Sequence, residues 1–309
     1  MTLDEILQGK DPDRMSELAP ADLRKLFWMY KGLLKRVERD TAYWQATNDN
    51  LRTAYERLDE QERELARAYQ TIRQDLEIAQ QVQHALLPKD HPEMLARFEF
   101  SVYHKQMTEV GGDYYDFYRL RDGCHAIGVF DISGHGVSAA LIMAYLKAQL
   151  VQTMEQVSRP REIVEYLNTA TVGFLREVRR YATVNFVSFG EHSFRYVCGG
   201  GYGVLIRGGG EVHTFNKGDP FIGLRRRAYS EYELPFETGD VLALYTDGLV
   251  EAQDNSGADY STRRLHELVR TNSHLPANQI LQRCLDDYGQ FRRVDADDIT
   301  LIVLRRRAA

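Results

Sequence analysis

Hydrophobic residues recur at every seventh position over about fifty residues of the N-terminal third. The series reads Val37, Trp44, Leu51, Leu58, Leu65, Ile72, Ala79 and Leu86. An apolar repeat of this period and length indicates a left-handed coiled coil. The positions four residues further on are mixed and include Asn48 and Glu62, which favours a specific register over high stability. We expect this helix to pair with a second copy as a homodimer; packing on its own domain is the alternative.

The pattern divides the chain into three regions. Apolar residues at helical spacing over 13–36 predict one or two amphipathic helices ahead of the repeat. Pro88 and Pro92 end the helical pattern, and short β-rich runs follow. The expected organisation is an N-terminal helical segment at 1–36, a coiled-coil linker helix at 37–88 and a compact domain at 89–309.

The compact domain alternates strand-like runs with paired helical stretches. The predicted strands are 98–105, 125–132, 182–190, 193–200, 203–209, 211–215, 240–246 and 299–305. The predicted helices are 137–156, 160–178, 262–270 and 276–289. Because the strands cluster and the helices come in pairs, the order favours an α+β layered sandwich over a doubly wound parallel sheet.

Composition narrows the class of protein. Of the 309 residues, 43% are hydrophobic and 27% charged, which is ordinary for a soluble globular chain. We expect no membrane span, no secretion signal and a cytoplasmic location. Cys124, Cys198 and Cys284 lie too far apart for a zinc knuckle or a disulfide framework. The net charge of −6 argues against nucleic-acid binding, so the basic clusters at 225–227 and 305–307 are interpreted as solvated surface.

Acidic residues stand at the ends of four apolar runs. They are Asp113 after a glycine pair, Asp131 before "ISGHG", Asp247 before Gly248, and Asp297 with Asp298 before the last strand. A single Asp-Gly is more simply a turn. Several carboxylates brought together repel one another unless a cation lies among them, and an all-oxygen set suits Mg²⁺ or Mn²⁺.

These motifs also carry a family resemblance. "VGGDYYD", "DISGHGVSAAL", "LYTDGLVEAQDNSG" and "DDITLIVL" resemble, in order, the motifs of PPM-type metal-dependent serine/threonine phosphatases of the bacterial SpoIIE/RsbU-like branch. The resemblance covers about 78–305 and implies an αββα sandwich with two central antiparallel sheets. It also implies two Mn²⁺ or Mg²⁺ ions held by aspartates at one edge.

The resemblance implies a role for each acid. Asp131 would bridge both ions, with the Ile132 carbonyl contributing to one. Asp247 and Asp297 would complete the second ion, and Asp113 would lie near the first, directly or through water. Asp298 is an alternative to Asp297.

The chemistry expected of such a site is attack of a metal-bridging hydroxide on phosphorus, with no serine or cysteine nucleophile. His135 is a candidate acid for the leaving oxygen, but we favour a role in positioning the turn or capping the next helix. Relatives often carry an Asn-Ala-Gly-His-like segment where this chain has "VCGGGYGVLI" at 197–206. We interpret this stretch as a hairpin turn rather than a phosphate-cradling loop, because no helix follows it.

The function implied by the resemblance is hydrolysis of phosphoserine or phosphothreonine on a small regulatory protein. In this branch the usual substrates are STAS-type anti-sigma-factor antagonists, in stress or developmental signalling. An activator protein would act on the N-terminal region, and residues 78–88 would pass the signal on. The alternatives are a phosphatase-fold scaffold without turnover and a phosphoesterase that acts on small molecules.

Overall fold

The computed structural model describes residues 19–88, 97–215, 218–293 and 297–307. The chain divides into two compact units, Met1–Arg73 and Gln74–Ala309. Helix α2 (Pro20–Leu86) crosses the division, and it continues without a break past the boundary expected at residue 36. Residues 13–18 of the expected N-terminal helices lie outside the described residues.

The second unit begins earlier than the domain start expected at residue 89. The last turns of α2 belong to it, because Leu86 and Leu87 pack against a hydrophobic core cluster. Gln83 is also buried there, at 3% exposure. The final part of the linker helix is therefore a structural part of the compact unit.

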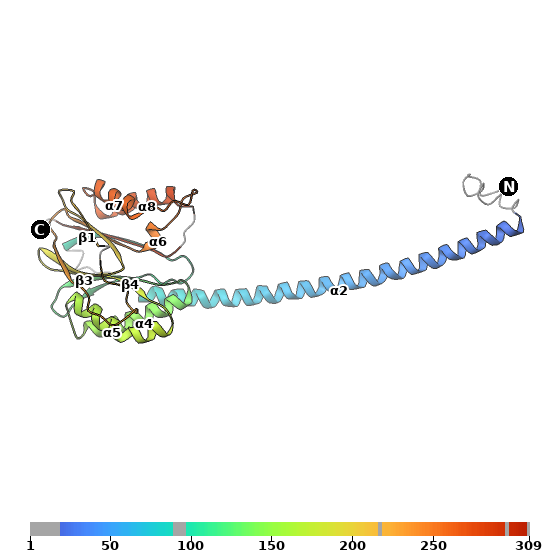
Figure 1. Cartoon of the computed structure of the whole chain (residues 1–309), viewed down its shortest axis with the longest axis horizontal. Coiled ribbons are helices and arrows are strands. Elements are labelled where there is room, and N and C mark those ends of the chain that lie inside the picture. The colour runs from blue at the N-terminus through green and yellow to red at the C-terminus, as the bar shows by residue number, and fades with distance from the viewer. Residues whose placement is uncertain (1–18, 89–96, 216–217, 294–296, 308–309) are drawn as a thin grey trace. The chain divides into compact units, whose positions relative to one another are not determined.

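Two antiparallel five-stranded sheets form the centre of the second unit (Figure 1). We call the first the β9 sheet; its order is β1 (Phe98–Lys105), β10 (Ile299–Arg306), β9 (Val241–Tyr245), β6 (Tyr202–Ile206) and β7 (Val212–Thr214). The second is the β3 sheet, with the order β2 (Tyr114–Arg119), β3 (His125–Ile132), β4 (Ala182–Phe189), β5 (Ser193–Gly199) and β8 (Tyr232–Pro235).

Helices cover the outer face of each sheet. Figure 1 shows α4 (Val137–Met154) and α5 (Pro160–Glu177) beside the β3 sheet. The β9 sheet carries α6 (Asp247–Val250), α7 (Thr262–Thr271) and α8 (Ala277–Phe291) on the opposite side. The predicted αββα sandwich is confirmed.

The layers are held by three hydrophobic clusters. Aromatic side chains fill the space between the sheets, with Phe98 and Phe189 in contact at a ring-centroid distance of 4.8 Å. The other two clusters lie under the helix pairs. By length and composition α4 is apolar enough to span a membrane. Its buried side chains, such as Ile142 and Leu146, pack in the cluster under α4 and α5, as those of a core helix do.

Strands β2 and β8 have no strand-like pattern in the sequence. Strand β2 carries Asp116 in its middle, which interrupts the apolar pattern of "VGGDYYDFY". The burial of Asp116 is possible because Lys147 pairs with its carboxylate at 2.9 Å and Tyr114 donates to it at 2.6 Å. Strand β8 is a four-residue edge strand with mostly exposed side chains, so it has no apolar pattern.

The prediction of a hairpin turn at 197–206 is wrong. Gly200 and Gly201 join β5 to β6, which belong to different sheets, so this loop is a crossover between the layers. Gly200 has φ +73°, and an added Cβ would lie 2.0 Å from the Phe221 ring. At Gly201 an added Cβ would lie 2.7 Å from the Asn185 amide nitrogen. The glycines are required by this close passage and by the left-handed backbone.

Candidate metal centre

Strand pairing brings the predicted acids to strand ends that neighbour one another. Tyr114 pairs with Phe130, which places the residue before β2 beside the end of β3. Leu301 pairs with Tyr245, which places the end of β9 beside the start of β10. Asp113 and Asp131 therefore meet on the β3 sheet, and Asp247 meets Asp297 on the β9 sheet.

Hydrogen bonds from the β9 sheet join these two pairs through Asp113. The Thr246 and Thr300 hydroxyls both donate to its Oδ2, at 2.8 and 2.6 Å. The Thr300 amide in turn donates to the Thr246 hydroxyl at 2.9 Å. Asp113 is 1% exposed, so this carboxylate is fixed between the sheets.

Asp298 makes a second link between the sheets. Its Oδ1 accepts from the Met107 amide at 2.7 Å, and its Oδ2 accepts from the Gly112 amide at 2.5 Å. An added Cβ on Gly111 would lie 2.2 Å from the same Oδ2. Both carboxylate oxygens of Asp298 are thus occupied by the loop before β2, whereas its half-buried neighbour Asp297 accepts only from the Asp298 amide among the described residues.

The turn after Asp131 explains the glycines around His135. Gly134 and Gly136 have φ +90° and +74°, which side chains rarely adopt. An added Cβ on Gly112 would lie 2.7 Å from the Ile132 carbonyl oxygen, so the two loops are in close contact. His135 is exposed, and the N-cap of α4 is Gly136 without a side-chain cap. The helix-capping role expected of His135 is therefore wrong.

Burial, and then the neighbouring carboxylates, raise the pKa values of the acids in this centre. Burial raises the pKa of Asp131 to about 9, and the charges of Asp113 and Asp247 add to the rise. The pKa of Asp247 rises to about 6, through burial and then the charge of Glu251; a hydrogen bond from Asp131 opposes that rise. Burial also raises the pKa of Asp113 well above its ordinary value, against the two threonine hydrogen bonds.

This donor set fits hard divalent cations. Among the described residues, no three His, Cys, Asp or Glu side chains already form a chelating group. The fit comes from the chemistry: neighbouring carboxylates that are wholly or partly buried repel one another and are stabilised by a cation, and oxygen donors suit Mg²⁺ and Mn²⁺.

Three contributors to this region were not predicted. Thr246 and Thr300 hold Asp113, and the only hint in the sequence is that each stands within two residues of an acid. Gln83, from α2, donates to the Gly111 carbonyl at 2.7 Å and accepts from the Gly111 amide at 3.1 Å. No local pattern marks Gln83, since its partner lies 28 residues away.

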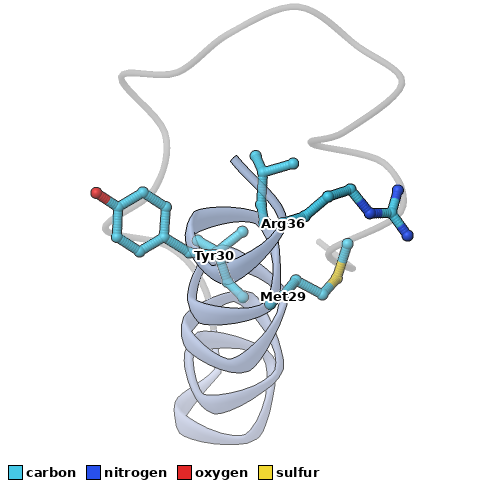
Figure 2. Close-up of a pocket in the computed structure, with 6 residues that line it drawn as sticks. Met29, Tyr30 and Arg36 are labelled. Atoms are coloured by element: carbon cyan, nitrogen blue, oxygen red, sulfur yellow. The ribbon is translucent and has the colours of Figure 1, made fainter. Parts of the chain in front are cut away.

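A cavity in the first unit has a different character. Figure 2 shows it beside α2, with Met29, Tyr30 and Arg36 among its six lining residues. Its volume is about 500 Å³, and its lining contains no carboxylate. It is therefore no candidate for a metal site.

Comparison with known proteins decides the family. Residues 121–307 match the family model described as Stage II sporulation protein E (SpoIIE). The chain belongs to the SpoIIE family. It is a PPM-type serine/threonine protein phosphatase, a hydrolase, as the four motifs had indicated.

Curated sequence relatives of this SpoIIE-family chain include other phosphatases. Phosphoserine phosphatase RsbU of Bacillus subtilis is 26% identical over 77% of the chain and 72% of its own length. Two further relatives are longer proteins. The chain spans 46% of the length of phosphoserine phosphatase RsbP of Bacillus subtilis and 42% of the length of protein IcfG of Synechocystis.

Solved structures show the same architecture. The SiaA-PP2C domain of Pseudomonas aeruginosa has a TM-score of 0.68 at 24% identity, over 77% of this chain and 98% of that one. RsbX in complex with magnesium has a TM-score of 0.52 at 17% identity, over 68% of this chain and 96% of that one.

Proposed function

We propose that this SpoIIE-family chain dephosphorylates phosphoserine or phosphothreonine on a small regulatory protein in the cytoplasm. The substrate we favour is a STAS-type anti-sigma-factor antagonist in stress or developmental signalling. The observation that carries the proposal is the gathering of buried and half-buried acids from four strand ends, in a chain of this family. RsbU, which is named a phosphoserine phosphatase, supports the substrate class.

The proposed ligands of two Mn²⁺ or Mg²⁺ ions are Asp113, Asp131, Asp247, Asp297 and the Ile132 carbonyl. We choose Asp297 over Asp298 because both carboxylate oxygens of Asp298 accept backbone hydrogen bonds. The magnesium in the RsbX structure supports a divalent cation for this fold. When bound, such ions supply an activated water and neutralise charge on a phosphoryl group.

The remaining residues of the centre hold the ligands in place. Thr246 and Thr300 fix the orientation of Asp113 by their two hydrogen bonds. A side chain at Gly112 would displace the Ile132 carbonyl, since an added Cβ would lie 2.7 Å from its oxygen. Rigid support of this kind is what a preorganised site requires.

The exposed apolar side chains of the N-terminal region are evidence for a homodimer. Large apolar side chains of the seven-residue series are exposed along α2, among them Trp44 at 67%, Leu58 at 51% and Leu65 at 71%. A stripe of this kind is stabilised when a second helix covers it. We therefore propose that α2 forms a parallel coiled coil with a second copy.

We also propose that an activator protein bound to the N-terminal region regulates the site through the end of α2. Gln83 is hydrogen-bonded to both polar groups of Gly111, and Gly111 lies against the Asp298 carboxylate. A shift of this last helical turn would therefore be transmitted to the loop that carries Asp113. A discrete change of helix register is a suitable two-state element for such a switch.

The test is manganese-dependent phosphate release from a phosphoserine protein. Asp131→Asn and Asp247→Asn should each reduce turnover by more than about a thousandfold, since each removes charge where cations would sit. Asp286→Asn, an exposed acid on α8, is the matched control and should retain full activity. Wild-type activity in either site variant at saturating manganese would exclude the ligand assignment. Binding of the phosphoprotein without turnover by the wild type would instead favour the scaffold.

A further inference from the structure

A group of arginines lies beside the candidate centre. Arg176, Arg179 and Arg180 lie at the end of α5 and before β4. Arg225 and Arg226 lie in the loop between β7 and β8, and both are exposed. These two segments are 45 or more residues apart in sequence, so their proximity comes from the fold.

The two segments are joined side by side. Ala182 and Ile222 exchange backbone hydrogen bonds of 3.0 and 2.8 Å. The Tyr181 and Phe221 rings stack at a centroid distance of 4.8 Å. Buried Asn168 of α5 donates to the Arg225 carbonyl at 2.9 Å, which ties the arginine loop to the helix. The two segments that carry the arginines therefore lie next to each other, and Arg179, Arg225 and Arg226 are exposed on them.

This surface adjoins the turn that follows Asp131. The Ser133 amide donates to the Tyr181 carbonyl at 2.9 Å, and the Tyr181 amide donates to the Ser133 hydroxyl at 3.0 Å. The Arg180 guanidinium lies over Gly134, where an added Cβ would be 2.4 Å from Nη1 and 2.9 Å from Cζ. Arg180 is therefore the innermost member of the group.

The positive charge of this surface is not neutralised locally. Arg227 pairs with Asp219 at 2.6 Å. Within the described ranges, the side chains of Arg179, Arg180, Arg225 and Arg226 form no ion pair. The chain as a whole has a formal charge of −6, so an uncompensated basic surface next to a phosphoryl-transfer site calls for an anionic ligand.

We propose that this arginine surface, made of Arg179, Arg180, Arg225 and Arg226, binds acidic side chains that flank the phosphorylated residue of the substrate protein. The proposal rests on the proposed phosphatase function and adds a substrate preference to it. Guanidinium groups bind carboxylates through paired, charge-assisted hydrogen bonds, which makes arginine suited to this task. The acidic chain as a whole disfavours a membrane surface or nucleic acid as the ligand.

The experiment compares three phosphoserine peptides that differ only in their flanking residues: aspartate, glycine or lysine. Wild-type enzyme with manganese should have the highest kcat/KM for the aspartate peptide, about tenfold above the glycine peptide, as several partly exposed charge pairs can provide. Arg225→Glu with Arg226→Glu should abolish this preference and favour the lysine peptide. A reversal of this kind identifies a direct charge contact, which loss of folding cannot produce.

The matched control reverses two exposed arginines on the opposite helical layer, Arg263→Glu with Arg283→Glu. It carries the same change in net charge and should retain the wild-type preference. The preference should also decrease as salt increases, since exposed charges are screened.

Two results would overturn the proposal. The first is equal turnover of the three peptides by the wild type; the second is an equal loss of preference in both double variants. If equal turnover is accompanied by binding to phosphatidylserine vesicles that Arg225→Glu/Arg226→Glu abolishes, the surface is assigned to a membrane instead. Absence of turnover for every phosphoserine substrate would overturn the proposed function itself, a distinct outcome.

Discussion

At the scale of single residues, the candidate centre depends on glycines that leave room for carboxylates. Gly111 is buried, and an added Cβ would lie 2.2 Å from Oδ2 and 2.7 Å from Cγ of Asp298. Gly111→Ala should therefore displace Asp298 and weaken its bonds to the Met107 and Gly112 amides. We expect a loss of about 1–3 kcal/mol in the free energy of unfolding, as for other overpacked sites. Denaturant unfolding measures it.

Gly173→Ala is the matched control within the same unit. Gly173 lies in α5 with nothing within 4 Å of an added Cβ. Because alanine favours the helix, this change should stabilise the protein by up to about 1 kcal/mol. An unchanged free energy of unfolding in Gly111→Ala would show that the loop yields easily and that Asp298 is not held as described.

The sequence located the acids at this scale but not their partners. Asp113, Asp131 and Asp247 each end or precede an apolar run, so their position at strand ends could be predicted from local pattern. The bond from Thr300 to Asp113 spans 187 residues and depends on how the two sheets face each other. No local pattern contains that information.

At the scale of elements, prediction succeeded where a single periodicity dominated. Strand β3 and the start of α4 were predicted to the residue, because an apolar run ends at glycines before a helical pattern. The crossover at Gly200 was predicted as a hairpin, since two strands separated by glycines look the same in sequence whichever sheet receives the second. Sheet membership is a property of the tertiary structure.

The contact between α2 and the loop before β2 makes a second prediction. Gln83→Leu would leave the buried amide and carbonyl of Gly111 without this partner, which costs about 1–3 kcal/mol for each such group. Because Gly111 lies against Asp298, we expect kcat at saturating manganese to fall by about tenfold, equivalent to about 1.4 kcal/mol in the barrier. Steady-state kinetics measures it.

Gln81→Leu provides the control, since Gln81 is exposed on the same helix. It should have wild-type kinetics. If Gln83→Leu unfolds at the same denaturant concentration as the wild type and has the same kcat, the end of α2 and the candidate centre are not coupled through this residue.

At the scale of the whole molecule, the long helix and the compact unit differ in how they are stabilised. The compact unit buries its apolar residues in three clusters, whereas α2 exposes its seven-residue stripe before Arg73. Propensity alone stabilises an isolated helix only slightly, and most helices in proteins depend on packing of an apolar face. We therefore expect the exposed stripe of α2 to pack against a second helix. The proposed homodimer follows from this difference between the two units.

Replacing Leu58 and Leu65 with aspartate tests the dimer. Both residues are exposed in the single chain, so the variant keeps its compact unit intact. In a dimer the two substitutions would place like charges opposite each other in a buried seam, where each unpaired carboxylate costs several kcal/mol. We expect light scattering to show a dimer for the wild type and a monomer for the double variant, with altered basal or activator-stimulated phosphatase activity.

Gln70→Asp with Gln74→Asp adds the same two charges away from the stripe and should remain dimeric. A wild type that is monomeric at tens of micromolar would exclude the dimer. If the double variant is monomeric but its basal and activator-stimulated activities are unchanged, α2 serves only for dimerisation and does not regulate the site. The reason is that a switch acting through helix register requires two paired helices.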